Sequence, residues 1–150
     1  MDSYPILKHM LYSRKLYELL FSNLPSDVEI GRTEIDILGF LSNHPDMNTS
    51  AQISEYRMIP KANISKAVDA LCRKGLLITR RDETDRRRLC LELTERAQPV
   101  IAQIQVVQQH YRSILTAGFS HQELALCESF LARMTQNAQN QLKEEAHGNQ

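Results

Sequence analysis

The sequence has few of the residues on which catalytic loops and metal sites are built. Five glycines occur in 150 residues, and neither a phosphate-cradling glycine loop nor a nucleophile elbow is present. The three cysteines, Cys72, Cys90 and Cys127, are far apart and show no CxxC spacing, which argues against a disulfide framework and a zinc knot. The five histidines form no HxxxH pair. We therefore expect reduced thiols, no enzymatic activity, no cofactor and no metal site.

Long apolar runs are also missing. No stretch approaches the roughly 20 consecutive apolar residues of a membrane span, and the first residues lack the basic-then-apolar pattern of a secretory signal. A hydrophobic content of 42% with 24% charged residues is typical of one compact domain that buries its own core. We expect a cytoplasmic protein of a single domain with no membrane partner.

The net charge of zero hides a strong segregation along the chain. Residues 57–91 carry ten Lys or Arg against four Asp or Glu, whereas residues 1–56 and 92–150 are both acidic on balance. A basic segment of this kind is either the electrostatic footprint of a polyanion partner or a solvated surface without one. The motif in which the segment lies has to decide between these interpretations.

Apolar residues at three- and four-residue steps predict six helices. Their ranges in chain order are 4–24, 34–43, 50–57, 60–74, 95–117 and 121–142. Residues 76–80 and 89–93 are β-prone and flank a polar turn, which predicts a two-stranded hairpin. The polar tail 143–150 is expected to fray.

Capping signals mark several helix starts. Thr49 with Gln52 and Ser120 with Glu123 have the spacing of capping boxes. Thr94 is expected to cap the long fifth helix. The fold class is therefore mainly α with a small β-hairpin wing (α+β).

The order helix, turn, helix and basic hairpin is that of a winged helix-turn-helix, which places one helix in the major groove of DNA and the hairpin on phosphates or the minor groove. Side chains expected to contact DNA lie at the start of the third helix, on the fourth helix and on the hairpin. They are Thr49, Ser50, Lys61, Ala62, Asn63, Ser65, Lys66, Arg73, Arg80, Asp85, Arg86, Arg87 and Arg88.

Individual roles follow from side-chain chemistry. Asn63 can read adenine through two hydrogen bonds, and Lys66 suits guanine or a phosphate, although both residue types are also ordinary on a helix surface. Arginine is favoured for phosphate and narrow minor grooves, and five arginines lie between Arg80 and Arg88. Asp85 among them is either a strut that fixes a neighbouring guanidinium or a plain turn former.

The stretch from Gln52 to Ala97 resembles the MarR family of multiple-antibiotic-resistance regulators. The matching residues are Ile53, Ile64, Ser65, Val68, Asp69, Leu71, Lys74, Gly75, Leu76, Asp82, Asp85, Arg86, Arg87, Leu93, Thr94 and Glu95. The wing pattern DxxDRR followed by LTE is uncommon by chance. The resemblance implies an obligate homodimer with a winged part at 31–94 and a helical dimerisation part at 1–30 and 95–150.

The resemblance also implies specific roles, and the sequence departs from the family pattern at three positions. Arg87 would be the wing arginine inserted in the minor groove, with Asp85 as its partner. Arg57 stands where such proteins usually bury an aliphatic residue, Ala70 where a second basic residue is common, and Ala97 where glycine is usual. Many relatives bind a small aromatic or phenolic effector between the interlocked helices and the winged part. Candidate lining residues are His9, Tyr12, Arg14, Tyr17 and Tyr111.

The sequence thus predicts a sequence-specific DNA-binding transcription regulator. The expected form is a ligand-responsive repressor that binds a palindromic operator as a homodimer, with half-sites about one helical turn apart. The alternative is a winged-helix module whose basic hairpin meets an acidic protein partner. Both hypotheses place the same surface at the centre of function.

Overall fold

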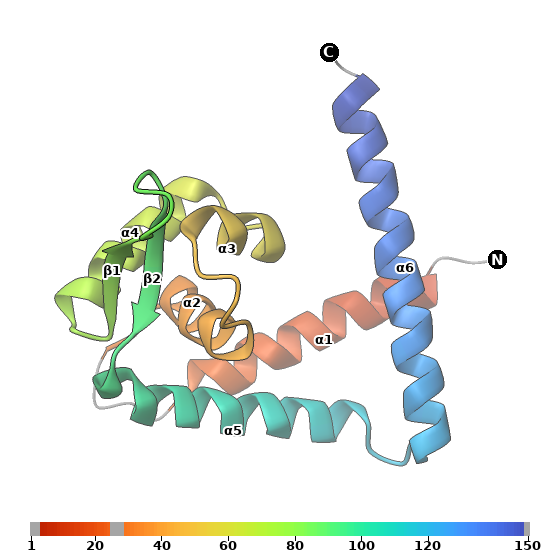
Figure 1. The fold of residues 1–150 in the computed structure, drawn as a ribbon. Coiled ribbons are helices and arrows are strands. Elements are labelled where there is room, and N and C mark those ends of the chain that lie inside the picture. The colour runs from red at the N-terminus through yellow and green to blue at the C-terminus, as the bar shows by residue number, and fades with distance from the viewer. Residues whose placement is uncertain (1–3, 25–28, 149–150) are drawn as a thin grey trace. The chain divides into compact units, whose positions relative to one another are not determined.

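A computed structural model describes residues 4–24 and 29–148. Its elements are α1 (Tyr4–Ser22), α2 (Arg32–Asn43), α3 (Ser50–Arg57), α4 (Lys61–Arg73), β1 (Leu77–Arg81), β2 (Leu89–Leu93), a 3-10 turn η1 (Glu95–Ala97), α5 (Gln98–Leu115) and α6 (His121–Gly148) (Figure 1). The predicted fold class, mainly helical with a β-hairpin wing, is confirmed. Contacts divide the chain into two compact units, residues 1–111 and 112–150, which are described separately below.

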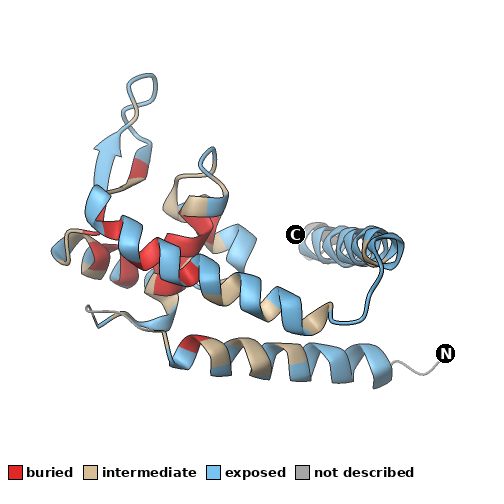
Figure 2. Ribbon diagram, turned by 90° about the horizontal axis from the view of Figure 1, so that it is seen from below, coloured by how far each residue is buried: buried red, intermediate tan, exposed pale blue. Residues whose placement is uncertain are grey.

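The core of the first unit is built around α2. This helix buries six consecutive or near-consecutive residues, from Ile35 to Leu41, so it is apolar around most of its circumference and belongs at the centre of the unit. Helix α4 instead buries a single stripe at three- and four-residue steps, from Ile64 to Leu71. Figure 2 shows buried residues concentrated on α2 and on the elements that face it. One side of α4 is therefore left to solvent.

The helix-turn-helix is formed by local signals that the sequence contains. The capping box is present, because Gln52 N donates to Thr49 Oγ1 at 3.3 Å and Thr49 N donates to Gln52 Oε1 at 3.1 Å. Helix α3 ends at Arg57, and the next residue, Met58, adopts a left-handed conformation with φ 53°. Ser54 Oγ donates to the carbonyl of Ile59 at 2.7 Å and closes the turn that leads into α4.

The hairpin is antiparallel, with Leu77 opposite Leu93 and Arg81 opposite Leu89. Leu77 and Leu91 are buried, and Leu91 N donates to the Asn48 carbonyl at 2.8 Å, which joins β2 to the loop before α3. The expected cap by Thr94 is wrong. Its hydroxyl donates to the Gly75 carbonyl at 2.7 Å, and the chain enters α5 through the 3-10 turn η1 instead.

Helices α1 and α5 complete the first unit. Gly39 of α2 lies so close to α5 that a Cβ there would be 3.2 Å from Gln108 Nε2 and 3.3 Å from Ile104 Cγ2. Phe21 is the buried residue of α1, and the ring of Tyr17 packs on it with centroids 4.5 Å apart. Most of the apolar side chains of α1 remain exposed.

The second unit consists of the end of α5 and the long helix α6. The predicted capping box is present, since Ser120 N donates to Glu123 Oε2 at 2.8 Å and Glu123 N donates to Ser120 Oγ at 3.3 Å. The hydrogen bond from the backbone N of Ser120 to the Glu123 carboxylate, together with the Ser120 hydroxyl, lowers the pKa of Glu123. Arg112 Nη2 pairs with Glu128 Oε1 at 2.9 Å. The prediction of a frayed tail is wrong over residues 143–148, because α6 continues to Gly148.

Across residues 4–24 and 29–148, we find no helix with the length and apolar content needed to cross a membrane.

Candidate nucleic-acid interface and an adjoining pocket

Helix α4 presents a polar surface to solvent because its apolar stripe faces α2. Its first turns leave five predicted contact residues exposed on either side of the fully buried Ile64, and Arg73 is exposed at the other end. The five are Lys61, Ala62, Asn63, Ser65 and Lys66. Within the described chain, no hydrogen bond or ion pair uses the side chains of Lys61, Asn63 or Lys66. These polar groups are available to a partner.

The start of α3 is less available. Thr49 and Ser50 are half-buried, and both hydrogen-bonding functions of the Thr49 hydroxyl are used in the capping box, where Oγ1 also donates to Gln52 Oε1 at 2.9 Å. The structure thus gives Thr49 a role in fixing α3. Ser50 follows it directly as the first residue of the helix.

The five wing arginines fall into two groups. Arg80 Nε pairs with Glu92 Oε2 at 3.0 Å across the hairpin, and Arg88 Nη2 donates to Asn48 Oδ1 at 3.5 Å. Arg81 Nη1 donates to the Arg86 carbonyl at 3.5 Å. By contrast, no hydrogen bond or ion pair among the described residues uses the guanidinium of Arg86 or Arg87. Two unpaired cations therefore stand at the wing tip.

The two interpretations of Asp85 are separated by its contacts. Asp85 Oδ1 accepts a hydrogen bond from the backbone N of Arg87 at 3.0 Å, and no guanidinium is paired with it within the part of the chain that the structure covers. This is the contact of a turn former. Asp85 thus orients Arg87 through the backbone and leaves the Arg87 side chain unpaired.

Asp82 was not predicted to be a functional residue, yet its side chain organises the wing tip. Asp82 Oδ1 accepts hydrogen bonds from Thr84 Oγ1 at 2.6 Å, from Thr84 N at 2.8 Å and from Asp85 N at 3.1 Å. The bonds from the side chain and backbone of Thr84 and from the backbone of Asp85 lower the pKa of Asp82 to about 2. The sequence signal for this role is an aspartate followed two residues later by a threonine, because an aspartate side chain in a turn hydrogen-bonds to the backbone two residues later.

This pKa gives a prediction for acid pH. Because the pKa of Asp82 is lower in the folded wing than its ordinary value of 3.8, the carboxylate stabilises the turn above pH 3.8 and loses that effect as the pH falls through about 2. The amide resonances of Thr84 and Asp85, followed by NMR, should titrate with a midpoint near 2. The variant Asp82→Asn should lack this titration. A midpoint at 3.8 would show that the three hydrogen bonds are not formed in solution.

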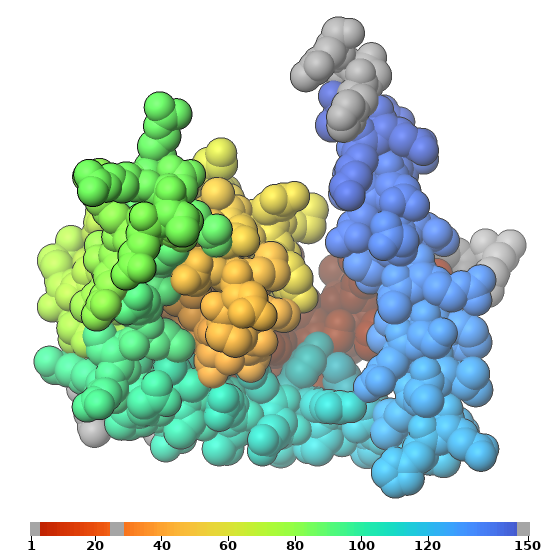
Figure 3. Space-filling model, in the orientation of Figure 1, coloured from red at the N-terminus to blue at the C-terminus, as the bar shows by residue number. Residues whose placement is uncertain are grey.

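Both basic elements lie on one side of the first unit. In Figure 1, α4 and the tip of the hairpin lie on the side of α2 that faces away from α5. Figure 3 shows the wing tip projecting beyond the neighbouring surface of this unit. The exposed start of α4 and the unpaired arginines Arg86 and Arg87 thus form one protruding basic surface, which we call the reading surface. A protruding positive surface of this shape fits the groove of a duplex better than it fits a small molecule.

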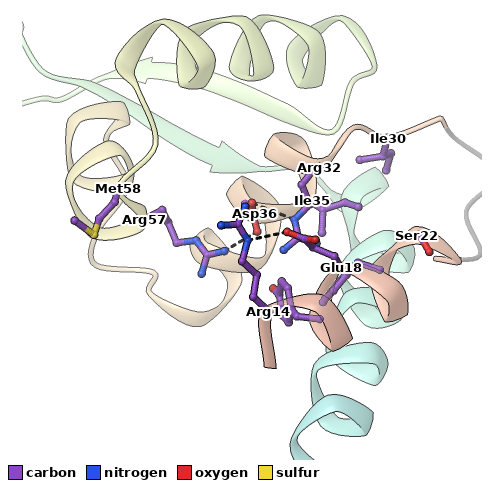
Figure 4. A pocket seen from close by; sticks show the side chains of 11 residues that line it. Arg14, Glu18, Ser22, Ile30, Arg32, Ile35, Asp36, Arg57 and Met58 are labelled. Atoms are coloured by element: carbon purple, nitrogen blue, oxygen red, sulfur yellow. Dashed lines mark hydrogen bonds and ion pairs between the residues drawn. The ribbon is translucent and has the colours of Figure 1, made fainter. Parts of the chain in front are cut away.

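An open pocket of about 770 Å³ lies between α1, α2 and the end of α3 (Figure 4). Its lining is partly apolar and partly charged, and consists of Arg14, Tyr17, Glu18, Phe21, Ser22, Ile30, Arg32, Ile35, Asp36, Arg57 and Met58. Three guanidiniums and two carboxylates are among these groups. The pocket thus combines apolar surface with an excess of positive charge.

Two of the five predicted effector residues, Arg14 and Tyr17, line this pocket. Tyr111 lies beside Tyr17, with ring centroids 5.2 Å apart, and is not part of the lining. His9 and Tyr12 are exposed on an earlier part of α1 and do not line it. The structure therefore does not bring the five together in one pocket.

The charged residues Arg32, Asp36 and Arg57 were not predicted to line the pocket. Arg57 Nη2 pairs with Asp36 Oδ1 at 2.6 Å, and Arg32 Nε pairs with Asp36 Oδ2 at 3.3 Å. Figure 4 shows Arg57 reaching from the end of α3 to Asp36 on α2. The departure noted at Arg57 is thus explained by an ion pair with α2 in place of aliphatic packing.

Two of the three cysteines, Cys72 and Cys90, have surroundings that disfavour thiol reactivity. Burial of Cys72, together with the nearby carboxylate of Asp69, raises the pKa of its thiol. Cys90 is buried, and its Sγ lies 3.9 Å from Asp82 Oδ2. Because the thiolate is the reactive form, a raised pKa disfavours oxidation of Cys72.

Within the described residues, no cluster of three or more His, Cys, Asp and Glu residues suited to a metal ion is found.

Comparisons with known proteins agree with this geometry. Residues 29–88 match the model of the MarR family. The transcriptional regulator AdcR of Streptococcus pyogenes is 29% identical over 127 residues, which cover 81% of this chain and 84% of that protein. A MarR transcriptional regulator from Methanosarcina mazei superposes with a TM-score of 0.77 at 20% identity, covering 93% of each chain. MepR of S. aureus, solved as a DNA complex, gives a TM-score of 0.66 at 19% identity over 90% of this chain and 93% of that one.

Proposed function

We propose that this chain is a member of the MarR family and a sequence-specific DNA-binding transcription regulator, because residues 29–88 match the model of that family and the chain has the winged helix-turn-helix fold. In this proposal it acts as a ligand-responsive repressor, as a homodimer on a palindromic operator. The observation that carries the proposal is the reading surface, where the exposed start of α4 and the unpaired Arg86 and Arg87 lie on one side of the first unit. MepR, which has this fold, was solved with DNA.

The chemistry of the reading surface divides into two tasks. Helix α4 enters the major groove, where each base pair presents a distinct pattern of donors and acceptors. Asn63 and Lys66 project from its first turns and read base edges or fix the helix on phosphates. Arg86 and Arg87 neutralise phosphates or enter the minor groove, where an unpaired guanidinium is attracted most strongly if the groove is narrow.

A second copy of the chain is needed to cover apolar surface that this copy exposes. In the first unit, Ile6, Leu7, Met10 and Leu11 of α1 are 44–69% exposed. In the second unit, Leu126, Phe130, Leu131, Met134 and Leu142 of α6 are 44–57% exposed. Apolar stripes of this length on a monomer are typical of protein interfaces. A two-fold dimer would present two copies of α4 to half-sites about one helical turn, or about 34–36 Å, apart.

The pocket supplies the site for an effector. Its excess of guanidinium over carboxylate favours an anion, and Tyr17, Phe21, Ile35 and Met58 favour a flat apolar body. We propose a small aromatic acid as the ligand class, bound by Arg14 and Tyr17 among others. Binding of this ligand would lower the affinity of the protein for the operator.

Salt dependence tests the DNA-binding proposal against the alternative of a protein-interaction module. The dissociation constant for a duplex should be measured by fluorescence anisotropy over a range of salt concentrations. Each phosphate contact should contribute about −0.9 to the slope of log affinity against log salt, so several contacts predict a steep line. A module that recognises an acidic protein would show no measurable retention of duplex in dilute buffer, and that result would remove the proposal.

A further inference from the structure

We propose that the Arg57–Asp36 ion pair is a latch that an acidic effector opens by competing with Asp36 for Arg57. The inference rests on the proposed function, because it names how the pocket controls the reading surface. The latch joins α2, the centre of the core, to the last residue of α3. It also lines the pocket, so a ligand there would meet both partners.

The charges around Asp36 leave room for a second anion. Asp36 is 10% exposed, and its two carboxylate oxygens accept one guanidinium each, Oδ1 from Arg57 and Oδ2 from Arg32. Two cations thus share a single carboxylate, which leaves one positive charge unbalanced at this point of the pocket. Arg14 adds no net charge because it pairs with Glu18 at 2.9 Å, and both of these side chains are more than half exposed. A monoanion beside Asp36 would complete the charge balance.

The two arginines differ in how firmly they are held. The Arg32 guanidinium lies over the rings of Tyr17 and Phe21, 4.4 and 5.1 Å from their centroids, in addition to its contact with Asp36. Stacking of this kind fixes a guanidinium in position. Within the described chain, the Arg57 guanidinium pairs with Asp36 alone. An arriving carboxylate would therefore draw Arg57 away from Asp36 and leave Arg32 in place.

Moving Arg57 matters because the end of α3 has few other attachments. Ile53 is the buried residue of this eight-residue helix. Its second half is attached to α2 by the Tyr56 ring, whose centroid lies 5.1 Å from that of Phe40 and 4.9 Å from that of His44, and by the latch. The chain then passes through the left-handed Met58, Ile59 and Pro60 into α4. Release of Arg57 would loosen the turn that orients the reading helix.

A second ion pair provides a matched control. Lys74, at the end of α4, pairs with Glu34 of α2 at 2.5 Å, and both side chains are largely buried. This pair also joins α2 to the helix-turn-helix, yet neither partner lines the pocket. Loss of it should affect stability without affecting the response to an effector.

The experiment uses the full chain with benzoate as the anionic probe and benzamide as its neutral counterpart. Benzoate affinity is measured by calorimetry for the wild type, Asp36→Asn, Arg57→Leu and Glu34→Gln. Removing the competing carboxylate should tighten benzoate binding about tenfold in Asp36→Asn, and removing its partner should weaken it about tenfold in Arg57→Leu. Glu34→Gln should match the wild type within about twofold. The affinity for benzamide should not differ in this order among the wild type and the three variants.

The effect on DNA gives the second measurement. Saturating benzoate should weaken duplex binding by the wild type and by Glu34→Gln, and it should leave duplex binding by Arg57→Leu unchanged. Urea unfolding of each variant establishes that Asp36→Asn and Arg57→Leu are folded, and either one alone suffices to test the latch. Equal benzoate affinity in Asp36→Asn, Arg57→Leu and the wild type, or no benzoate binding by any of them, would overturn the latch and leave DNA binding intact. Failure of the wild type to bind duplex would instead defeat the proposed function, while the order of benzoate affinities would still report on the latch.

Discussion

The double variant Arg86→Ala, Arg87→Ala should bind duplex DNA about a hundredfold more weakly than the wild type. The loss should be similar for every DNA sequence, because contacts to phosphates or to the minor groove carry little base information. The slope of log affinity against log salt should fall by about 1.8, at about 0.9 per contact. These two guanidiniums have no intramolecular partner in the described chain, so their removal should leave the fold unchanged. Fluorescence anisotropy with several duplexes measures both effects.

Two matched variants make this prediction specific. Arg80→Ala removes an arginine of the same hairpin that is already paired with Glu92, and it should weaken binding much less. Asn63→Ala should cost on the order of 1 to 3 kcal/mol mainly at one base position, because an amide reads a base edge through two hydrogen bonds. Unchanged affinity in both the double arginine variant and Asn63→Ala would rule out the reading surface as the site of DNA binding.

Truncation of the chain before Ser120 should abolish the dimer and, with it, operator binding. The truncated chain lacks α6. The apolar side chains of this helix are exposed in a single copy, and a second copy is needed to cover them. Each truncated chain then binds one half-site independently, so the gain from linking two chains in a dimer is lost. The affinity for a full operator should fall by about a hundredfold or more. Sedimentation velocity measures the assembly, and anisotropy measures the binding.

A milder variant supports the same test. Phe130→Asp places a charge among the exposed apolar residues of α6 and should also dissociate the dimer, whereas Gln136→Asp on the same helix adds a charge outside that set. A truncated chain that still sediments as a stable dimer would contradict the proposed role of α6.

Much of the fold could be predicted because its determinants are local. The Thr49–Gln52 and Ser120–Glu123 capping boxes are read from residues three apart, and both are present in the structure. The apolar stripe of α4 is read from helical spacing, and it dictates which of its polar residues face solvent. The hairpin follows from alternation on either side of a polar turn. In each case the interacting residues are close in sequence.

Apart from the tail of α6, the errors concern contacts between residues that are distant in sequence. Thr94 does not cap α5 because its hydroxyl meets the Gly75 carbonyl, 19 residues earlier. Arg57 was noted only as a departure from the family pattern, since its partner Asp36 lies 21 residues away on another helix. Of the effector candidates, Tyr12 and His9 have the right chemistry but lie on a part of α1 that does not line the pocket. Helical periodicity alone cannot say which turns of a helix reach a given site.

DNA binding by this protein should be sequence-specific, with α4 and the wing reading the duplex. The most direct test is to select bound fragments from a pool of random duplex DNA with the full-length protein and to determine the enriched sequence. We expect a consensus of two inverted half-sites whose centres are about one helical turn apart. Each half-site should contain an adenine contacted by Asn63, and Asn63→Ala should lose the preference for that base. Recovery of the pool without enrichment would contradict sequence-specific binding by this surface.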